Sequence, residues 1–150
     1  MVRDDFQGPF RTVVAGVDFS ETSRRALEAG AMLAANEASI LRSVFVVPDA
    51  QGAAMLPSQD VDRELELFTR AATDAWPGLE VRCDVYPHTG HRSGLLEFAT
   101  VVHGDIVVLG TRGRTNLRDV MLGSTAEKVL RDSLIAVLAC KPAEIAAGQA

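Results

Sequence analysis

The sequence predicts an α/β fold, a single doubly wound five-stranded parallel sheet in the order 3-2-1-4-5 with helices on both faces. Two observations predict it. Short apolar segments alternate along the chain with longer segments whose apolar residues recur at helical spacing. The third short segment alternates strictly between apolar and polar residues, which is typical of a half-exposed strand at a sheet edge. The connections between parallel strands are then expected to be right-handed.

The expected strands are short and rich in β-branched residues. They cover residues 12–17, 39–47, 79–86, 105–110 and 134–140. The third of them has an apolar side and a polar side, formed by Val81, Cys83 and Val85 and by Arg82, Asp84 and Tyr86. The fourth, DIVVLG, is the most apolar.

The first two helices are predicted from apolar residues on one face. In the first, Leu27, Ala31 and Ala34 recur at helical spacing, Ser20 or Thr22 can cap the start, and Glu21 suits the first turn. The face of the second helix is formed by Val61, Leu65, Phe68, Ala72 and Trp76. We expect its aromatic residues to pack in the core and the sequence PG at 77–78 to end it.

The last two helices are shorter. The third is predicted from Leu95, Leu96, Ala99 and Val102, with His103 as its C-terminal residue. The fourth follows Gly123 and turns Ala126, Val129 and Leu130 inward. His88 and His91 fall in the segment HTGH, which we interpret as a solvated loop because no further metal ligand stands near it. Glu64 and Glu66 are interpreted as part of a solvated helix face.

Composition limits the class of protein. A chain of 150 residues with 47% hydrophobic and 23% charged residues is typical of one soluble domain, which we place at residues 11–142, between a flexible lead at 1–10 and a tail at 143–150. The net charge of −5 disfavours binding to nucleic acid or anionic membranes. Without a secretory signal or an apolar run of about 18 residues, we expect a cytoplasmic protein. Cys83 and Cys140 are expected as buried thiols on strands.

The strand order predicts where a ligand would bind. In doubly wound sheets, ligands occupy the crevice at the carboxyl ends of the strands where the order reverses. Here this point lies between the first and fourth strands, which end at Asp18 and Gly110. The two loops that follow are therefore expected to face the same crevice.

The loop after the fourth strand reads GTRGRTNLRDVMLGST, residues 110–125. Gly110 and Gly113 permit a sharp turn and a close ligand, and Arg112 and Arg114 can supply positive charge. The triplet 123–125 (GST) opens a helix, whose first amides have no internal partners and suit a phosphate. The alternative is purely structural: a tight turn at glycine and a helix cap at Ser124. Neither G-x-x-x-x-G-K-[ST] nor G-x-G-x-x-G after the first strand is present.

The spacing Gly110-x2-Gly113-x9-Gly123-Ser124 resembles the nucleotide-binding signature of the universal stress protein family. The segments VVAGVDFSETSRRAL and GDIVVLGTRGRTNLRDVMLGSTAEKVL are similar to its first and fourth strand–helix units, and the likeness runs over residues 12–142. The resemblance implies an adenine nucleotide alpha-hydrolase-like, Rossmann-like fold and a stress-response sensor or regulator. It also implies binding of ATP, or of AMP or ADP, together with Mg²⁺.

The resemblance implies a role for each matching position. Gly16 would line the adenine pocket, the backbone of Val46 would read the adenine edge, and Asp18 would lie against adenosine and polyphosphate, with an indirect role toward Mg²⁺. The ribose and phosphate loop would consist of Gly110, Thr111, Gly113, Arg114 and Asn116. The phosphate cradle would consist of Gly123, Ser124 and Thr125.

The last strand, residues 134–140, is apolar on both faces, which is a hazard for an uncovered edge. A homodimer that pairs this strand with its twin would cover it, and the family resemblance implies the same arrangement. The alternative is a monomer whose own tail covers the edge.

Other function classes remain open from the sequence. One is a slow ATPase or nucleotidyl-transferring enzyme of the same fold, although the sequence places no second acid or histidine beside Asp18 and we assign no catalytic residue. Another is a dimeric interaction module with an empty crevice. A phosphorylated receiver domain is disfavoured: Thr111 and Lys141-Pro142 would suit it, but the first strand ends in Asp18 without a second acid and the third strand has no terminal Asp.

Overall fold

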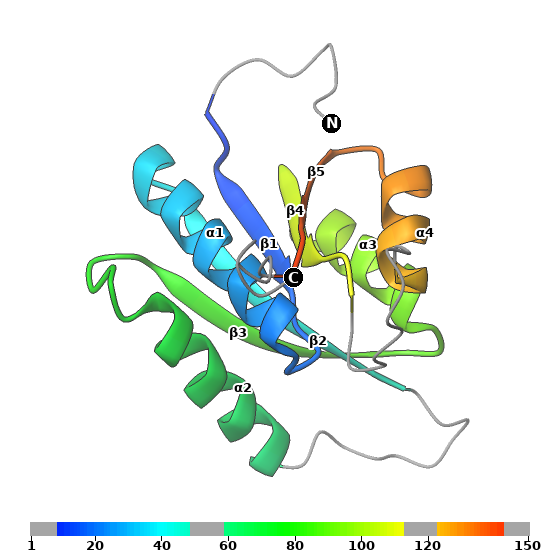
Figure 1. Cartoon of the computed structure of the whole chain (residues 1–150), viewed down its shortest axis with the longest axis horizontal. Helices are drawn as coiled ribbons and strands as arrows, with labels where there is room; N and C mark the ends of the chain where they lie inside the picture. The colour runs from blue at the N-terminus through cyan, green and yellow to red at the C-terminus, as the bar shows by residue number, and fades with distance from the viewer. Residues whose placement is uncertain (1–8, 49–58, 113–122, 143–150) are drawn as a thin grey trace, which may run out of the picture.

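The computed structural model describes residues 9–48, 59–112 and 123–142 (Figure 1). The expected lead and tail lie largely or wholly outside these residues, as do Gly113, Arg114 and Asn116. Strands and helices alternate as predicted. In chain order they are β1 (Thr12–Gly16), α1 (Glu21–Glu37), β2 (Ile40–Pro48), α2 (Gln59–Thr73), β3 (Val81–His88), α3 (His91–Val101), β4 (Ile106–Gly110), α4 (Ser124–Asp132) and β5 (Ala136–Cys140).

The described strands form one parallel sheet in the order β3-β2-β1-β4-β5. This confirms the predicted fold and strand order. The central strand is β1, and its residues Val13, Val14 and Ala15 are fully buried because strands and helices cover it on all sides. The half-polar strand β3 lies at one edge, as its alternation indicates.

Two hydrophobic clusters hold the helices on the two faces of the sheet, with α1 and α2 on one side and α3 and α4 on the other (Figure 1). Neighbouring residues of a strand point to opposite faces, so Val13 joins the first cluster and Val14 the second. Leu27 and Leu65 represent α1 and α2 in the first cluster. Phe98 belongs to the second, together with Val129 of α4.

Three local predictions were wrong. Helix α2 ends at Thr73, so Trp76 lies in the following turn, where its N–H donates to the Thr73 carbonyl, although its ring still packs against the core. Helix α3 ends at Val101, and His103 is in the left-handed region at φ 54°. The N–H of the following Gly104 bonds back to Ala99, which closes the helix in a Schellman motif. Strand β3 extends through His88, so this residue is part of a strand and not of a loop.

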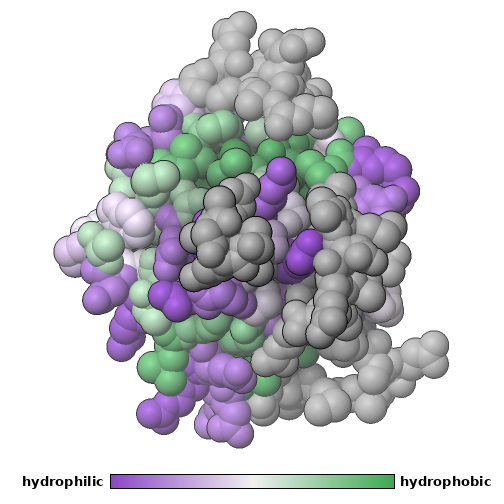
Figure 2. All heavy atoms as spheres, viewed as in Figure 1, coloured by the Kyte–Doolittle hydropathy of each residue, from purple (hydrophilic) through white to green (hydrophobic). Residues whose placement is uncertain are grey.

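The thiols of Cys83 and Cys140 are on strands, as predicted, but they are only partly buried. Burial raises the pKa of both thiols. The face drawn in Figure 2 mixes hydrophilic and hydrophobic residues. Among the described helices, none has both the length and the apolar character that crossing a membrane requires.

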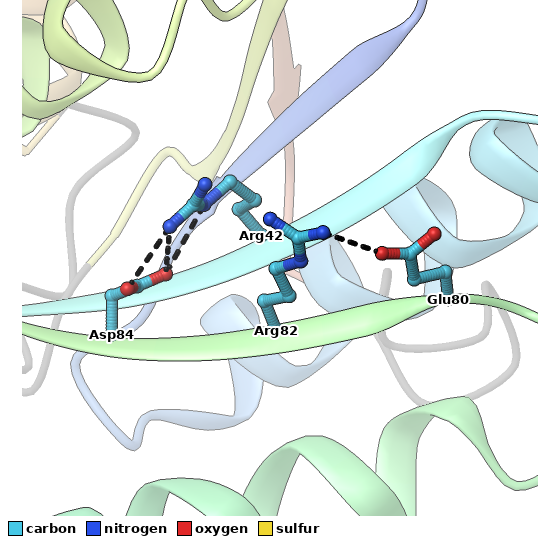
Figure 3. A network of polar contacts seen from close by, with 4 residues as sticks. All are labelled: Arg42, Glu80, Arg82 and Asp84. Carbon is cyan, nitrogen blue, oxygen red and sulfur yellow. Dashed lines mark hydrogen bonds and ion pairs between the residues drawn. The ribbon is translucent and has the colours of Figure 1, made fainter.

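A polar network joins β2 to β3 (Figure 3). Arg42 and Arg82 lie side by side on the two strands, and each has a carboxylate partner. Two guanidinium nitrogens of Arg42, Nε and Nη2, donate to the Asp84 oxygens at 3.1–3.2 Å, and the guanidinium lies over the ring of Phe98. The side chains of this pair are 21% and 29% exposed, against 53% and 56% for Arg82 and Glu80.

We therefore expect Asp84→Ala to lower the free energy of unfolding by about 1–2 kcal/mol, because it leaves the partly buried Arg42 without its charge partner. The matched control is Glu80→Ala, which removes the exposed partner of Arg82 and should cost less than about 1 kcal/mol. Urea unfolding of the two variants measures the difference. Equal losses would show that the half-buried pair contributes no more than the exposed one.

Candidate functional site

A cavity of about 850 Å³ opens at the carboxyl ends of the strands, at the predicted crevice. Every predicted site residue that the structure describes lines it. They come from the ends of β1, β2 and β4 and from the start of α4: Gly16, Asp18, Val46, Gly110, Thr111, Gly123, Ser124 and Thr125. The predicted Gly113, Arg114 and Asn116 lie outside the described residues.

The turn after β1 orients Asp18. Phe19 adopts the left-handed conformation at φ 63°, and its ring packs against Phe45 and Phe68 at centroid distances of 4.9 and 5.3 Å. The next residue, Ser20, caps α1 by accepting from the Ser23 N–H, and its own N–H and hydroxyl donate to Asp18 Oδ1. Among the described residues, Asp18 Oδ2 has no hydrogen-bond donor. One carboxylate oxygen therefore fixes the turn while the other remains available to the crevice.

The end of β2 presents an unpaired backbone edge to the crevice. Pairing of β2 with β1 ends at Gly16–Val44, and the Val17 N–H then donates to the Val44 carbonyl. Since alternate residues of a strand point their backbone groups to the same side, the N–H and C=O of Val46 point past the end of β1. No described residue bonds to them. A base edge that offers one donor and one acceptor side by side fits this backbone.

The N-terminus of α4 provides the donors for an anion. The Gly123 N–H donates to the Thr111 carbonyl, and the Thr111 N–H donates to Cys140, so the chain uses these two amides itself. The Gly123 carbonyl accepts the first helical hydrogen bond, which the Glu127 N–H donates. In the described part of the chain, the N–H groups of residues 124–126 have no partner, and α4 has no side-chain cap. These three amides carry the positive end of the helix dipole.

Two glycines in the crevice have structural reasons. A Cβ at Gly110 would lie 2.6 Å from Thr22 Cγ2 and 3.1 Å from the Thr22 backbone, so this glycine admits the start of α1. A Cβ at Gly16 would meet Leu95 Cδ2 at 2.8 Å. Gly110 therefore admits the protein's own helix, while the ligand approach that the sequence suggests at this cavity-lining residue stays a prediction.

Sequence reasoning missed several lining residues. Ser93 enters from the first turn of α3, and Lys128 and Arg131 enter from α4. The two cations follow Ser124 by one and two helical turns, so the helical repeat of α4 could have identified them. Among the described lining residues, Asp18 supplies the only carboxylate.

His88 belongs to a structural cluster beside the crevice. Its Nε2 lies 2.8 Å from Glu97 Oε2, and Tyr86 donates to the other Glu97 oxygen at 2.6 Å. The bond from Tyr86, and then that from His88, lowers the pKa of Glu97, and the same contact raises the pKa of Tyr86. The Gly90 N–H donates to His88 Nδ1. The described residues contain no group of three or more potential metal ligands.

The crevice thus combines, in one cavity, a backbone edge for a base with free amides for an anion. Hydroxyls of Ser93, Ser124 and Thr125 add further donors and acceptors. A flat polar base linked to a phosphate matches this arrangement, since each end meets the type of group that it binds.

The chain was compared with protein families, curated proteins and solved structures. The model of the universal stress protein family matches residues 9–141. The universal stress protein MJ0531 of Methanocaldococcus jannaschii is 40% identical over 47 residues, which cover 31% of this chain and 28% of that protein. The match therefore spans less than a third of that relative.

Three solved structures share the fold. The structure of protein MJ0577 superposes with a TM-score of 0.76 at 21% identity, covering 91% of this chain and 99% of that one. A universal stress protein in complex with cAMP gives 0.70 at 23% identity, with 88% and 97% covered. The universal stress protein of Archaeoglobus fulgidus in complex with dAMP gives 0.62 at 19% identity, with 87% and 97% covered. The family match covers most of the chain, and the chain belongs to the universal stress protein family.

Proposed function

We propose that this protein binds an adenine nucleotide, with ATP as the first candidate, and acts as a nucleotide-dependent sensor or regulator in the stress response. One observation carries the proposal: the Val46 backbone and the amides of residues 124–126, which have no hydrogen-bond partner among the described residues, line the same cavity. The complexes of two structural neighbours with cAMP and dAMP support an adenine ligand. The ligand-binding domain spans residues 11–142, and its place of action is the cytoplasm.

In this proposal, the Val46 backbone binds the adenine edge, and Gly16 and Leu95 form part of the pocket around the ring. The free amides and the hydroxyls of Ser124 and Thr125 bind phosphate. Thr111 positions this cradle through its bond to Gly123. The loop residues Gly113, Arg114 and Asn116 complete the ribose and phosphate contacts.

Magnesium, where it accompanies the nucleotide, neutralises phosphate charge and keeps several waters of its own. The free oxygen of Asp18 fits an indirect contact to such a hydrated ion. The described lining residues hold no second carboxylate to coordinate it. The residues present therefore favour binding, with magnesium held mainly by the phosphates.

Mass spectrometry of the ligand released from freshly purified protein tests the proposal, followed by calorimetry with ATP, AMP and adenosine. An adenine nucleotide in the released fraction, or binding at micromolar concentration, is the expected result. Absence of binding at millimolar concentration of all three would refute the proposal and favour a module whose crevice binds no nucleotide.

We predict that Asp18→Ala lowers ATP affinity more in the presence of magnesium than in its absence, because the carboxylate acts through the hydrated ion. Its bonds to Ser20 also shape the start of α1, so some loss without magnesium is expected. Calorimetry in magnesium and in EDTA separates the two contributions. Equal losses under both conditions would remove the metal role from Asp18.

We further propose that a second copy of this chain covers β5, so that the protein is a homodimer. In the described sheet β5 has β4 as its one neighbour, and its Leu138 is 38% exposed. Apolar strands at the end of a sheet favour pairing with another strand. We expect Leu138→Asp to convert the dimer to a monomer in sedimentation experiments, with Leu67→Asp on α2 as the control that leaves it unchanged. A monomeric wild-type protein would contradict this part.

A further inference from the structure

Two cations of α4 face the crevice beyond its free amides. Lys128 and Arg131 line the same cavity as Ser124. They follow Ser124 by four and seven residues, so the three side chains lie on one side of the helix. At about 1.5 Å of rise per residue, positive charge extends about 10 Å from the helix start. It therefore reaches past the amides that a single phosphate would occupy.

One carboxylate holds both cations. Lys128 Nζ lies 2.6 Å from Asp132 Oδ2, and Arg131 Nε lies 3.3 Å from Asp132 Oδ1. The contact with Lys128, and then that with Arg131, lowers the pKa of Asp132. Its carboxylate therefore stays ionised to a lower pH than that of an ordinary aspartate. Asp132 is the last residue of α4, where the negative end of the helix dipole disfavours a carboxylate.

The Lys128–Asp132 ion pair is weak enough for Lys128 to leave Asp132 and contact a ligand instead. Its side chains are 33% and 37% exposed, and such pairs contribute little stability. The lysine also precedes the acid, which is the less favourable order for an ion pair four residues apart in a helix. Ser124 stands one turn from Lys128 toward the N-terminus, and Asp132 one turn toward the C-terminus. The flexible lysine side chain can turn from one to the other.

Building on the proposed nucleotide site, we propose that Lys128 and Arg131 select ligands by their number of phosphates, and that Asp132 competes with the ligand for these cations. A monophosphate seated on the amides of residues 124–126 gains little from them. The outer phosphates of ADP and ATP bring further negative charge within their reach. Polyphosphate binding then replaces the contacts of Asp132 with contacts to phosphate.

Calorimetry in EDTA with AMP, ADP and ATP tests the selection. We expect Lys128→Gln to lower ATP affinity about 10-fold and AMP affinity less than about 2-fold, because it removes a charge that only outer phosphates meet. Arg131→Gln should act in the same direction, by about 3-fold. Asp132→Asn should raise ATP affinity about 3-fold and leave AMP affinity unchanged, since it frees both cations.

The matched control is Arg24→Gln, which removes an exposed helix cation that pairs with Glu21 and Glu28 and does not line the crevice. It makes the same change in net charge and should leave the ratio of ATP to AMP affinity as in wild type. A gain of affinity in Asp132→Asn cannot come from a damaged fold, so this variant also separates selection from a structural role.

The outcomes are distinct from those of the proposed function. Wild-type protein that binds neither AMP nor ATP overturns both proposals. Nucleotide binding with the same ATP-to-AMP ratio in wild type and Lys128→Gln overturns phosphate selection alone. An unchanged ATP affinity in Asp132→Asn, when Lys128→Gln does lose ATP selectively, overturns the competition by Asp132.

Discussion

Replacing Gly123 with valine is expected to weaken binding of ATP and AMP about 100-fold, or about 2.8 kcal/mol. Gly123 lines the crevice directly before the free amides that the proposed site uses for phosphate, so a larger side chain at this position is expected to compete with the ligand. Gly123 has φ −58° and ψ 153°, a conformation that valine adopts readily. The backbone therefore does not require glycine here, and the loss should appear in affinity far more than in stability. Calorimetry with AMP and ATP measures it.

The control for this variant is Ser133→Ala, at the other end of α4. The Ser133 hydroxyl bonds to Ile135 and does not face the crevice. Its replacement should leave nucleotide affinity unchanged. The same affinity in both variants would count against the cradle at the start of α4. Thermal unfolding of Gly123→Val should show a loss of less than about 1 kcal/mol, which the poorer helix cap accounts for.

Gly110→Ala is expected to lower the free energy of unfolding by about 2–3 kcal/mol, the upper range for overpacking in a well-packed site. The added methyl would lie 2.6 Å from Thr22 Cγ2 and 3.1 Å from the Thr22 carbonyl carbon. The first of these atoms belongs to a short buried side chain and the second to the backbone of α1, so neither can move away cheaply. Urea unfolding measures the effect.

Two variants test this explanation. Gly78→Ala adds a methyl that meets nothing within 4 Å, so it should not destabilise the protein and can stabilise it slightly through the unfolded chain. Thr22→Ser removes the Cγ2 that conflicts at 2.6 Å, so Gly110→Ala should cost less in that background. If Gly110→Ala is no more costly than Gly78→Ala, α1 does not pack on Gly110 as described.

The fold could be predicted because periodicity reports burial directly. Val13 and Val14 are both fully buried on opposite faces of β1, which appears in the sequence as an unbroken apolar run, whereas the edge strand β3 alternates. The ends of elements were harder to predict. Trp76 continues the apolar spacing of α2 although the helix has ended, because its ring reaches the core from the turn. Spacing shows which side chains are buried, but not which backbone stays helical.

The site could be predicted only in outline. The sequence places Asp18 and Gly123 at one crevice because parallel strands end at the same edge. It does not show that Phe19 turns left-handed to orient Asp18, since tertiary packing of its ring stabilises that conformation. Nor does it show that the Thr111 carbonyl accepts a hydrogen bond from the Gly123 N–H, or that Asp132 forms ion pairs with Lys128 and Arg131 of α4. These contacts depend on distances that no motif specifies.

In the proposed complex, the free amides at the start of α4 bind the phosphate while the backbone of Val46 binds the base. The most direct test is the backbone amide NMR spectrum during titration with adenosine and with AMP. We predict that the Val46 amide shifts with both ligands and that the amides of residues 124–126 shift strongly with AMP alone. Binding of AMP that leaves the amides of residues 124–126 unmoved, or that moves them equally with adenosine, would contradict the account.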